Sequence, residues 1–259
     1  MPIGFQCIFR AENDQVLTPD PATRRALAAL FIERGHQGAM FGFGIGDTHA
    51  HTIHDCAAAV ATKFARYTRT SMAQLLSVPM KPVKITPIND MFHAEELLRY
   101  VHRQDTHHGA NLDPLREGTS LPDLMGLRPA GLWLAGRVRE TCPRVERDDL
   151  LAQWGISEFS EVLDLPLLAV SGAAAIGTAD LLGNLPAQHL ARCACVHAAA
   201  GTPAYLIAQS LGITERGVRR LMKSAPDAAM VRAVRLQMGL RQMITVDPES
   251  YFLRPGGLR

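Results

Sequence analysis

The chain has 259 residues, of which 47% are hydrophobic and 20% are charged. This composition is typical of a folded globular protein and excludes a disordered or low-complexity chain. The length fits one large domain or two modest ones. The five cysteines show no Cys-x-x-Cys spacing and the chain opens without an apolar signal segment, so we expect a reduced, cytoplasmic protein.

The net charge of +2 hides an uneven distribution of charge along the chain. Residues 185–259 contain ten Lys and Arg but only four Asp and Glu, so this third is strongly basic. Such a basic region suggests contact with nucleic acid, although a solvated basic face gives the same composition. The apolar residues 163–185 are interrupted by Asp164, Pro166 and Asp180, so we expect a packed or linking segment there and no membrane span.

The N-terminal part alternates between strand and helix patterns. The predicted strands are 3–10, 38–45, 49–53 and 83–88, and the predicted helices are 21–34, 55–76 and 93–104. Asp20 can cap the first helix, Pro21 suits its first position, and Pro87 favours an edge position for the last strand. The order β-α-β-β-α-β predicts an α+β fold with a ferredoxin-like, split βαβ antiparallel sheet.

The C-terminal part is predicted to be helical. Helices are expected at residues 203–211 and 214–223, with Gly212 in the turn between them and Thr214 as a cap. Four cations fall on the exposed side of the second helix, as in a helix-turn-helix that binds DNA: Arg216, Arg219, Arg220 and Lys223. A helical hairpin without a DNA function is the alternative.

The chain therefore divides into three predicted segments. Residues 1–159 form the α+β domain, 160–184 a connector of low polarity, and 185–259 an all-α helix-turn-helix domain. Between the sheet and the connector, we expect loops over residues 105–147 and a short helix at 148–154.

His49 and His51 are the strongest candidates for a metal site. Side chains two residues apart on a strand point to the same face, so both imidazoles can bind one ion. The cofactor expected there is Mg²⁺ or Mn²⁺, with open positions for phosphate oxygens and water. Two ordinary strand histidines remain the alternative.

Tyr67 lies sixteen residues after His51, on a predicted helical stripe with Val60, Phe64 and Ser71. A phenol oxygen beside a metal can attack phosphorus and form a covalent phosphotyrosine. The same stripe is also typical of a core tyrosine.

Other residues complete the predicted site. Lys63, Arg66 and Arg69 flank Tyr67 and could hold DNA phosphates. Ser71, one turn after Tyr67, is the expected third metal ligand. Asp47, His54, Asp55 and Gln74 are the other candidates for this ligand.

These motifs together resemble the single-tyrosine HUH transposases, and most closely the REP-associated tyrosine transposases. The similar features are a strand, an amphipathic helix, a hairpin ending in His-x-His and a helix that carries Tyr-Thr-Arg. Residues 93–111, with the core Arg99-Tyr100-Val101-His102, and residues 131–155, ending in Trp154–Gly155, are also similar to segments of that family. The resemblance covers about residues 1–155 and, more loosely, 185–243, where some members carry a helix-turn-helix.

The resemblance implies metal-dependent cleavage and strand transfer of single-stranded or hairpin DNA through a 5′-phosphotyrosine, by a monomer rather than a dimer. His49 and His51 match the metal histidines, and Tyr67 matches the nucleophile. The sequence departs from the family at Ala50, usually bulky and apolar, and at Ser71, usually Asn or Gln. Residues 104–109 replace an Asn-Pro-x-Arg-Ala-Gly run.

These departures keep two other functions open. One is a domesticated, catalytically weak or inactive protein that binds a specific DNA sequence. The other is a histidine-metal hydrolase that forms no covalent adduct with its substrate.

Overall fold

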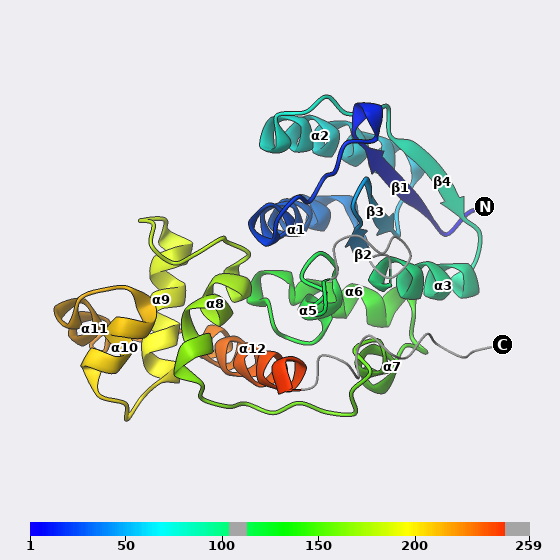
Figure 1. The fold of residues 1–259 in the computed structure, drawn as a ribbon. Helices are drawn as coiled ribbons and strands as arrows, with labels where there is room; N and C mark the ends of the chain where they lie inside the picture. The colour runs from blue at the N-terminus through cyan, green and yellow to red at the C-terminus, as the bar shows by residue number, and fades with distance from the viewer. Residues whose placement is uncertain (104–112, 247–259) are drawn as a thin grey trace. The chain divides into compact units, whose positions relative to one another are not determined.

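The computed structural model describes residues 1–103 and 113–246, and these form two compact units (Figure 1). Of the described residues, 1–103, 113–126 and 130–153 belong to the N-terminal unit, and 127–129 and 154–246 belong to the helical unit. The division after Gln153 falls a few residues before the predicted domain boundary at 159.

The N-terminal unit is built on a four-stranded antiparallel sheet. Its strands are β1 (Gly4–Arg10), β2 (Met40–Ile45), β3 (His49–His54) and β4 (Lys84–Ile88), in the spatial order β2-β3-β1-β4. Helix α1 (Pro21–Gly35) follows β1 and helix α2 (Ala58–Leu76) follows β3. The predicted order of strands and helices is therefore confirmed, and β4 with Pro87 is an edge strand as expected.

Local sequence signals explain where these elements begin and end. The Asp20 carboxylate accepts a hydrogen bond of 2.8 Å from the Thr23 backbone N–H, which caps α1, and Pro21 is the first residue of the helix. The hairpin between β2 and β3 closes where the Gly46 N–H donates to the His49 carbonyl at 2.9 Å. The roles of Asp20 and Pro21 were predicted from sequence, and both are confirmed.

The two faces of the sheet have separate hydrophobic cores. On one face, here called the α1–α2 face, Phe9 and Ala50 pack with Phe31 of α1 and Phe64 of α2. On the other, here called the α3 face, Ile53 packs with buried residues of helix α3 (Met91–His102). The sheet thus separates α1 and α2 from α3.

The segment predicted as loops over 105–147 contains several short helices among its described residues. These are α5 (Leu121–Leu124), the 3-10 turn η3 (Pro129–Gly131) and α6 (Trp133–Thr141), and α7 (Arg147–Ala152) follows. The loop prediction is therefore wrong over α6. Prolines interrupt the helical pattern of the residues before α6, and the whole stretch therefore looked like a loop. Helix α6 itself contains no proline, and it buries Leu134 and Val138, which lie four residues apart on one side of the helix.

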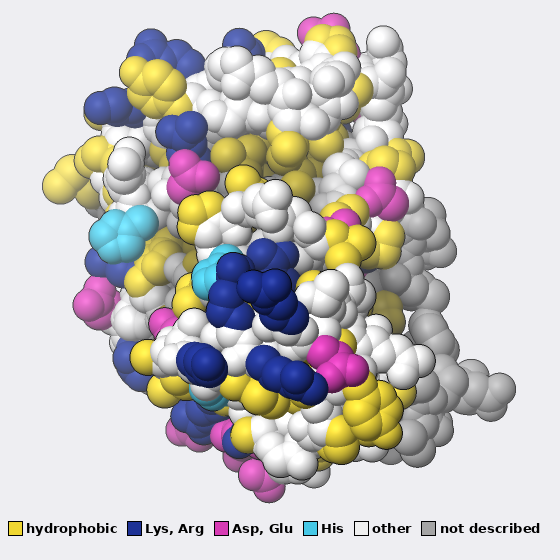
Figure 2. All heavy atoms as spheres, turned by 90° about the vertical axis from the view of Figure 1, so that its left-hand side faces the viewer, with side chains coloured by type: hydrophobic (Ala, Val, Ile, Leu, Met, Phe, Trp, Pro, Cys, Tyr) yellow, Lys and Arg dark blue, Asp and Glu magenta, His cyan; other side chains and the backbone are white. Residues whose placement is uncertain are grey.

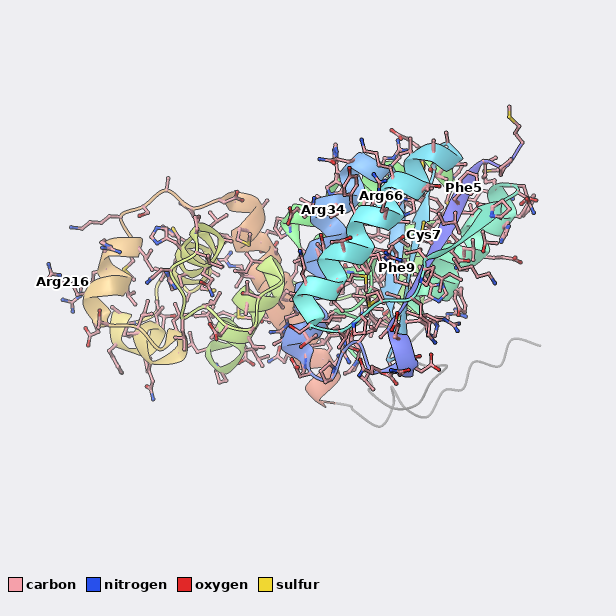
Figure 3. The ribbon with its side chains drawn as sticks, turned by 90° about the horizontal axis from the view of Figure 1, so that it is seen from above. Phe5, Cys7, Phe9, Arg34, Arg66 and Arg216 are labelled. Carbon is pink, nitrogen blue, oxygen red and sulfur yellow. The ribbon has the colours of Figure 1, made fainter. Side chains whose placement is uncertain are left out.

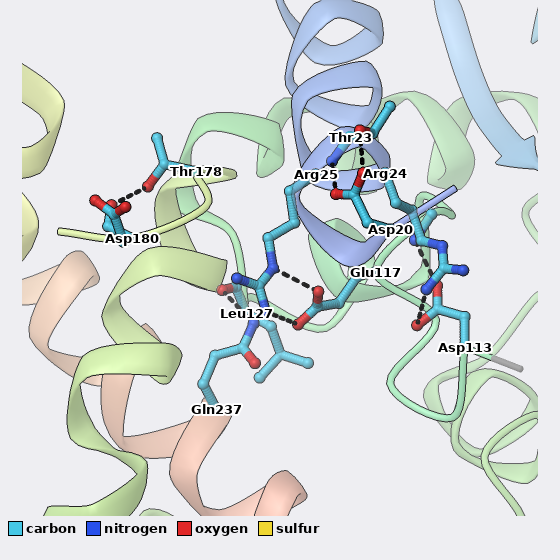
Figure 4. A network of polar contacts seen from close by, with 11 residues as sticks. Asp20, Thr23, Arg24, Arg25, Asp113, Glu117, Leu127, Thr178, Asp180 and Gln237 are labelled. Atoms are coloured by element: carbon cyan, nitrogen blue, oxygen red, sulfur yellow. Dashed lines mark hydrogen bonds and ion pairs between the residues drawn. The ribbon is translucent and has the colours of Figure 1, made fainter. Parts of the chain in front are cut away.

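Residues 113–120 are held along β2 by buried polar contacts (Figure 4). Arg25 of α1 donates two hydrogen bonds to the Glu117 carboxylate, at 2.6 and 3.2 Å, and both side chains are buried. The Ile45 N–H donates to the Gly118 carbonyl at 2.9 Å, and Phe43 and Ser120 exchange further hydrogen bonds. This segment therefore covers the otherwise open edge of β2.

The helical unit contains five described helices. They are α8 (Leu165–Ile176), α9 (Pro186–Ala198), α10 (Ala204–Leu211), α11 (Glu215–Leu221) and α12 (Ala228–Val246). The predicted connector, 160–184, contains α8, whose Leu168 is fully buried in one core with residues of α9, α10 and α12. This segment is therefore part of the helical unit. No helix within residues 1–103 and 113–246 is long and apolar enough to span a membrane.

Candidate functional site

His49 and His51 lie on β3, which is an inner strand of the sheet. Alternation along the strand directs both side chains, with Ile53, to the α3 face. The two imidazole rings are 4.9 Å apart between centroids, and both residues are buried. The prediction that the two histidines share a face is confirmed.

Polar neighbours orient both rings through Nδ1. The side-chain amide of Gln6, on the adjacent strand β1, lies 2.9 Å from His51 Nδ1, and Thr48 Oγ1 lies 3.2 Å from His49 Nδ1. The Gln6 atom in this contact is the amide nitrogen, which donates to His51 Nδ1, so a lone pair at His51 Nε2 requires the amide to turn until its oxygen accepts from Nδ1–H. At His49, Nε2 presents a lone pair when the Thr48 hydroxyl accepts from Nδ1–H. Histidines that bind metal through one ring nitrogen typically donate from the other, and the Thr48 hydroxyl offers His49 such an acceptor.

Tyr100 of α3 is an aromatic residue in contact with His51. Its ring meets the His51 ring edge to face, with centroids 5.3 Å apart at 81°. Gly44 of β2, which pairs with His51 across the strands, makes this approach possible, because a Cβ at Gly44 would collide with the Val101 carbonyl. The absence of a side chain at Gly44 therefore brings the backbone of α3 close to the sheet beside His51.

Polar contacts also fix the end of α3 just after Tyr100. His102 Nε2 lies 2.9 Å from Ser120 Oγ, and Arg116 donates hydrogen bonds to the carbonyls of His102 (2.6 Å) and Gln153 (2.9 Å). Burial, with the nearby Arg116 charge, lowers the pKa of His102 to about 3, so this ring is neutral at physiological pH. These contacts hold α3 against the segment that follows it.

Two cations share the α3 face with the histidines. Arg10 is the direct cross-strand neighbour of His49, and Lys84 of β4 is the neighbour of Ile8 in β1. Residues directly opposite each other in an antiparallel sheet lie on the same face, and both cations are exposed. Sequence reasoning missed Arg10, Lys84 and Tyr100 as site residues. Counting strand positions from His49 and His51 through the expected pairing would have indicated the two cations.

Tyr67 lies on the other side of the sheet. The buried side of α2 consists of Ala61, Phe64, Ala65, Thr68 and Met72, and it packs on the α1–α2 face. Tyr67 itself is 50% exposed, and its hydroxyl accepts a 3.4 Å hydrogen bond from Arg66. The expectation that α2 directs Tyr67 at the histidines is wrong. The side chains of β3 that point toward α2 are Ala50, Thr52 and His54, whereas His49 and His51 point to the opposite face of the sheet.

The expected third ligand, Ser71, is separated from the pair in the same way, since Ser71 and Gln74 both belong to α2. Among the other candidates, His54 faces α2 and is held by Gly38 O at 2.8 Å and Thr52 Oγ1 at 2.7 Å. Burial lowers the pKa of His54 to about 4. Its partners identify it as a structural histidine.

The two acidic candidates differ in their surroundings. Asp55 accepts a hydrogen bond from Thr141 at 3.1 Å and pairs with Arg137 at 3.6 Å, so its carboxylate has protein partners. Asp47 lies in the β2–β3 turn, two residues before His49. Within the described part of the chain, no group of three or more His, Cys, Asp or Glu is arranged to hold a metal ion.

The predicted DNA-binding cations of α2 are therefore on the α1–α2 face. Lys63 and Arg66 are exposed and Arg69 is half-buried. The Arg66 guanidinium lies over the Tyr67 ring, 5.0 Å from its centroid.

The predicted C-terminal DNA-binding residues form one surface on the helical unit. Helix α10 ends at Leu211 and is followed by Gly212, which has a φ of +64°. Thr214 caps α11 by accepting a hydrogen bond of 3.1 Å from the Gly217 N–H. A hollow of about 540 Å³ is lined by Thr214, Arg216, Gly217, Arg219, Arg220 and Lys223. Figure 2 shows Lys and Arg side chains gathered on the face that carries α11, and Figure 3 shows Arg216 extending from that helix.

Opposite this basic side, α11 buries Val218 and Leu221 in the core of the helical unit. One cation on the exposed side has an acidic partner, since Arg219 forms an ion pair of 2.9 Å with Glu215 one turn earlier. The predicted separation of buried and basic sides is confirmed.

In comparisons with known proteins, no protein-family model, curated protein or solved structure matches the chain.

Proposed function

We propose that the protein cleaves and rejoins single-stranded DNA through a 5′-phosphotyrosine, with Tyr100 rather than Tyr67 as the nucleophile. The observation that carries this proposal is the contact between the Tyr100 and His51 rings on the face that also holds His49. The strand order β2-β3-β1-β4 is that of a ferredoxin-like, split βαβ sheet, in keeping with the resemblance to HUH transposases.

The donor set fits a divalent metal. His49 and His51 would hold Mg²⁺ or Mn²⁺ through Nε2, with Thr48 accepting from His49 Nδ1 and with the Gln6 amide turned so that its oxygen accepts from His51 Nδ1. Asp47, near His49 in the turn, is one source of a further oxygen ligand. Gln104 is another from sequence, because it follows Tyr100 by four residues, although it lies outside the described residues. When bound, the metal supplies Lewis-acid activation of the scissile phosphodiester.

The residues of the site then have separate roles. Tyr100 Oη attacks the phosphorus after loss of its proton to solvent, and the bond from phosphorus to the 3′ oxygen breaks. The released strand leaves as a 3′-hydroxyl that takes up a proton, and the other strand stays linked to Tyr100 through its 5′ phosphate. Arg10 and Lys84 bind neighbouring phosphates on the same face.

A helix-turn-helix formed by α10 and α11 complements this chemistry by binding target DNA. Arg216, Arg219, Arg220 and Lys223 provide the phosphate and base contacts.

A covalent adduct assay tests the proposal. The full chain is incubated with Mn²⁺ and a hairpin-containing single strand labelled at its 3′ end, and the products are separated on a denaturing gel. We expect a labelled protein adduct that EDTA and Tyr100→Phe abolish and that the matched variant Tyr67→Phe retains. An adduct that survives Tyr100→Phe would remove Tyr100 from the mechanism.

A second candidate function is DNA binding without cleavage. It is favoured by the basic surface of α11 and by the absence of a three-residue metal cluster among residues 1–103 and 113–246. It predicts salt-dependent DNA binding that Arg219→Ala and Arg220→Ala weaken. It also predicts that no covalent protein–DNA adduct forms, whichever metal ion is added. A metal-dependent product without an adduct would instead indicate a hydrolase.

A further inference from the structure

A groove lies between α1 and α2, entirely within the N-terminal unit. It has a volume of about 630 Å³ and is lined by Arg34, Gln37, Gly38, Ala59, Val60, Lys63, Phe64, Tyr67 and Thr68. Figure 3 shows Arg34 on α1 and Arg66 on α2 at this side of the unit. Because α1 and α2 cover the face opposite His49 and His51, the groove is separate from the proposed cleavage site.

The charge around this groove is almost entirely positive. Helix α2 carries Lys63, Arg66 and Arg69 and contains no Asp or Glu, and Arg34 adds a fourth cation from α1. None of these four side chains forms an ion pair with another residue in the described part of the chain. Glu33, exposed beside Arg34, is the acidic neighbour in α1. Unpaired cations along one helix are suited to a phosphate backbone.

The lining of the groove offers a flat aromatic surface beside these cations. Tyr67 is 50% exposed although it is a large aromatic residue, and Val60, two turns earlier in α2, is 39% exposed. Phe64 is buried beneath them. An exposed tyrosine next to an arginine is a common stacking platform for an unpaired nucleic-acid base.

One exposed polar side chain adds hydrogen-bonding groups to the same groove. Gln37 supplies an amide that lines the groove from the segment after α1. Thr68 also lines the groove, but its hydroxyl oxygen is buried and has no hydrogen-bond partner among the described residues, so a ligand would reach it only after a side-chain movement.

We propose that the α1–α2 groove binds an unpaired nucleotide of single-stranded DNA. The base stacks on Tyr67 and meets Gln37 with its edge, and the flanking phosphates lie against Lys63, Arg34 and Arg66. This goes beyond the cleavage chemistry, since it adds a second DNA contact on the far side of the sheet. It rests on the proposed function only for the choice of DNA as the polymer.

Fluorescence anisotropy measures this contact directly. A labelled thymidine oligonucleotide is titrated with the full chain in EDTA, in an Arg219→Ala/Arg220→Ala background that weakens the second DNA surface. We expect Tyr67→Leu to weaken binding about tenfold and Tyr67→Phe to leave it nearly unchanged, because only the ring is needed for stacking. Lys63→Ala should also weaken it, whereas Arg139→Ala, an exposed cation on α6, should not.

Photocrosslinking locates the bound strand. An oligonucleotide carrying 5-iododeoxyuridine should crosslink to peptides from Ala58–Leu76, and less so in Tyr67→Leu. Equal affinity of Tyr67→Leu and the parent, with no crosslink to α2, would overturn the proposal. Its failure is distinct from that of the proposed function: Tyr100→Phe should abolish the adduct and keep the groove affinity, whereas an absent adduct with intact groove binding refutes only the cleavage chemistry.

Discussion

The two faces of the N-terminal sheet differ in chemical character, although β3 contributes alternate side chains to both. On the α1–α2 face, β3 places Ala50 and His54 against an aromatic core in which Phe9 and Phe31 lie 5.8 Å apart. On the α3 face, the same strand places His49 and His51 beside Tyr100. The alternation of side chains along β3 therefore decides which helix can contact His49 and His51. Closeness in sequence does not decide it, since α2 follows β3 directly but packs on the other face.

The histidines show the same contrast at the level of single atoms. Both ring nitrogens of His54 have protein partners, and burial lowers its pKa to about 4. His49 and His51 each meet a polar neighbour at Nδ1, Thr48 for His49 and Gln6 for His51. A histidine-rich strand can thus contain structural and site residues side by side.

The largest expected effect concerns the two tyrosines. Tyr100→Phe should lower the rate of adduct formation by at least about a thousandfold, because it removes the attacking oxygen. Tyr67→Phe should change this rate less than about threefold. The measurement is the single-turnover rate in Mn²⁺ for both variants. The opposite ranking would move the site to the α1–α2 face.

Gly44→Ala should strongly destabilise the N-terminal unit. The added Cβ collides with the Val101 backbone carbonyl, so α3 must move, and we expect a loss of about 3 kcal/mol in the free energy of unfolding. Adduct formation should fall as well, because Tyr100 moves with α3. Chemical denaturation measures the first effect and the adduct assay the second.

Gly136→Ala is the matched control for Gly44→Ala. A Cβ at Gly136 meets nothing within 4 Å, and the residue lies inside helix α6, so stability should rise by about 0.5–1 kcal/mol. Equal effects of the two substitutions would show that α3 does not press on β2 at Gly44.

Acid should destabilise the N-terminal unit through its buried histidines. The folded pKa of His54 is about 4, below the usual 6.5, so the unfolded chain binds more protons between these values. The stabilising contribution of neutral His54 is complete above pH 6.5 and declines as the pH falls toward 4, by roughly 2–3 kcal/mol. His102, with a pKa of about 3, adds a similar loss that extends to lower pH.

Unfolding free energies measured from pH 8 to pH 4 test this expectation. His54→Gln should lower stability at pH 8 and flatten the slope between pH 6.5 and 4 by about one proton. An unchanged slope would show that His54 takes up its proton in the folded state without cost.

The smallest expected effect concerns the exposed ion pair of α11. Glu215→Gln should change the free energy of unfolding by no more than about 0.5 kcal/mol, because Arg219 and Glu215 are both solvated. DNA affinity should stay the same or rise, since Arg219 then loses its acidic competitor for phosphate. Arg219→Ala should leave stability equally unaffected but weaken DNA binding. A large stability loss in either variant would give α11 a structural role instead.

The sequence by itself determined the features that depend on near neighbours. The Asp20 cap, the Gly46 hairpin, the edge position of Pro87 and the Thr214 cap were all predictable, because each depends on bonds within a few residues. The His-x-His pair was predictable for the same reason, since strand alternation is a local property.

Only the tertiary structure decided which distant segments meet. The apolar stripe of α2 suggested that Tyr67 is directed inward, but Ala61, Phe64 and Thr68 are buried in its place, so the helix is rotated by packing against α1. Tyr100 reached His51 because Gly44 admits the backbone of α3, and α8 joined the helical core because its apolar residues find partners there. Contacts of this kind depend on side chains far apart in the chain, and no local pattern encodes them.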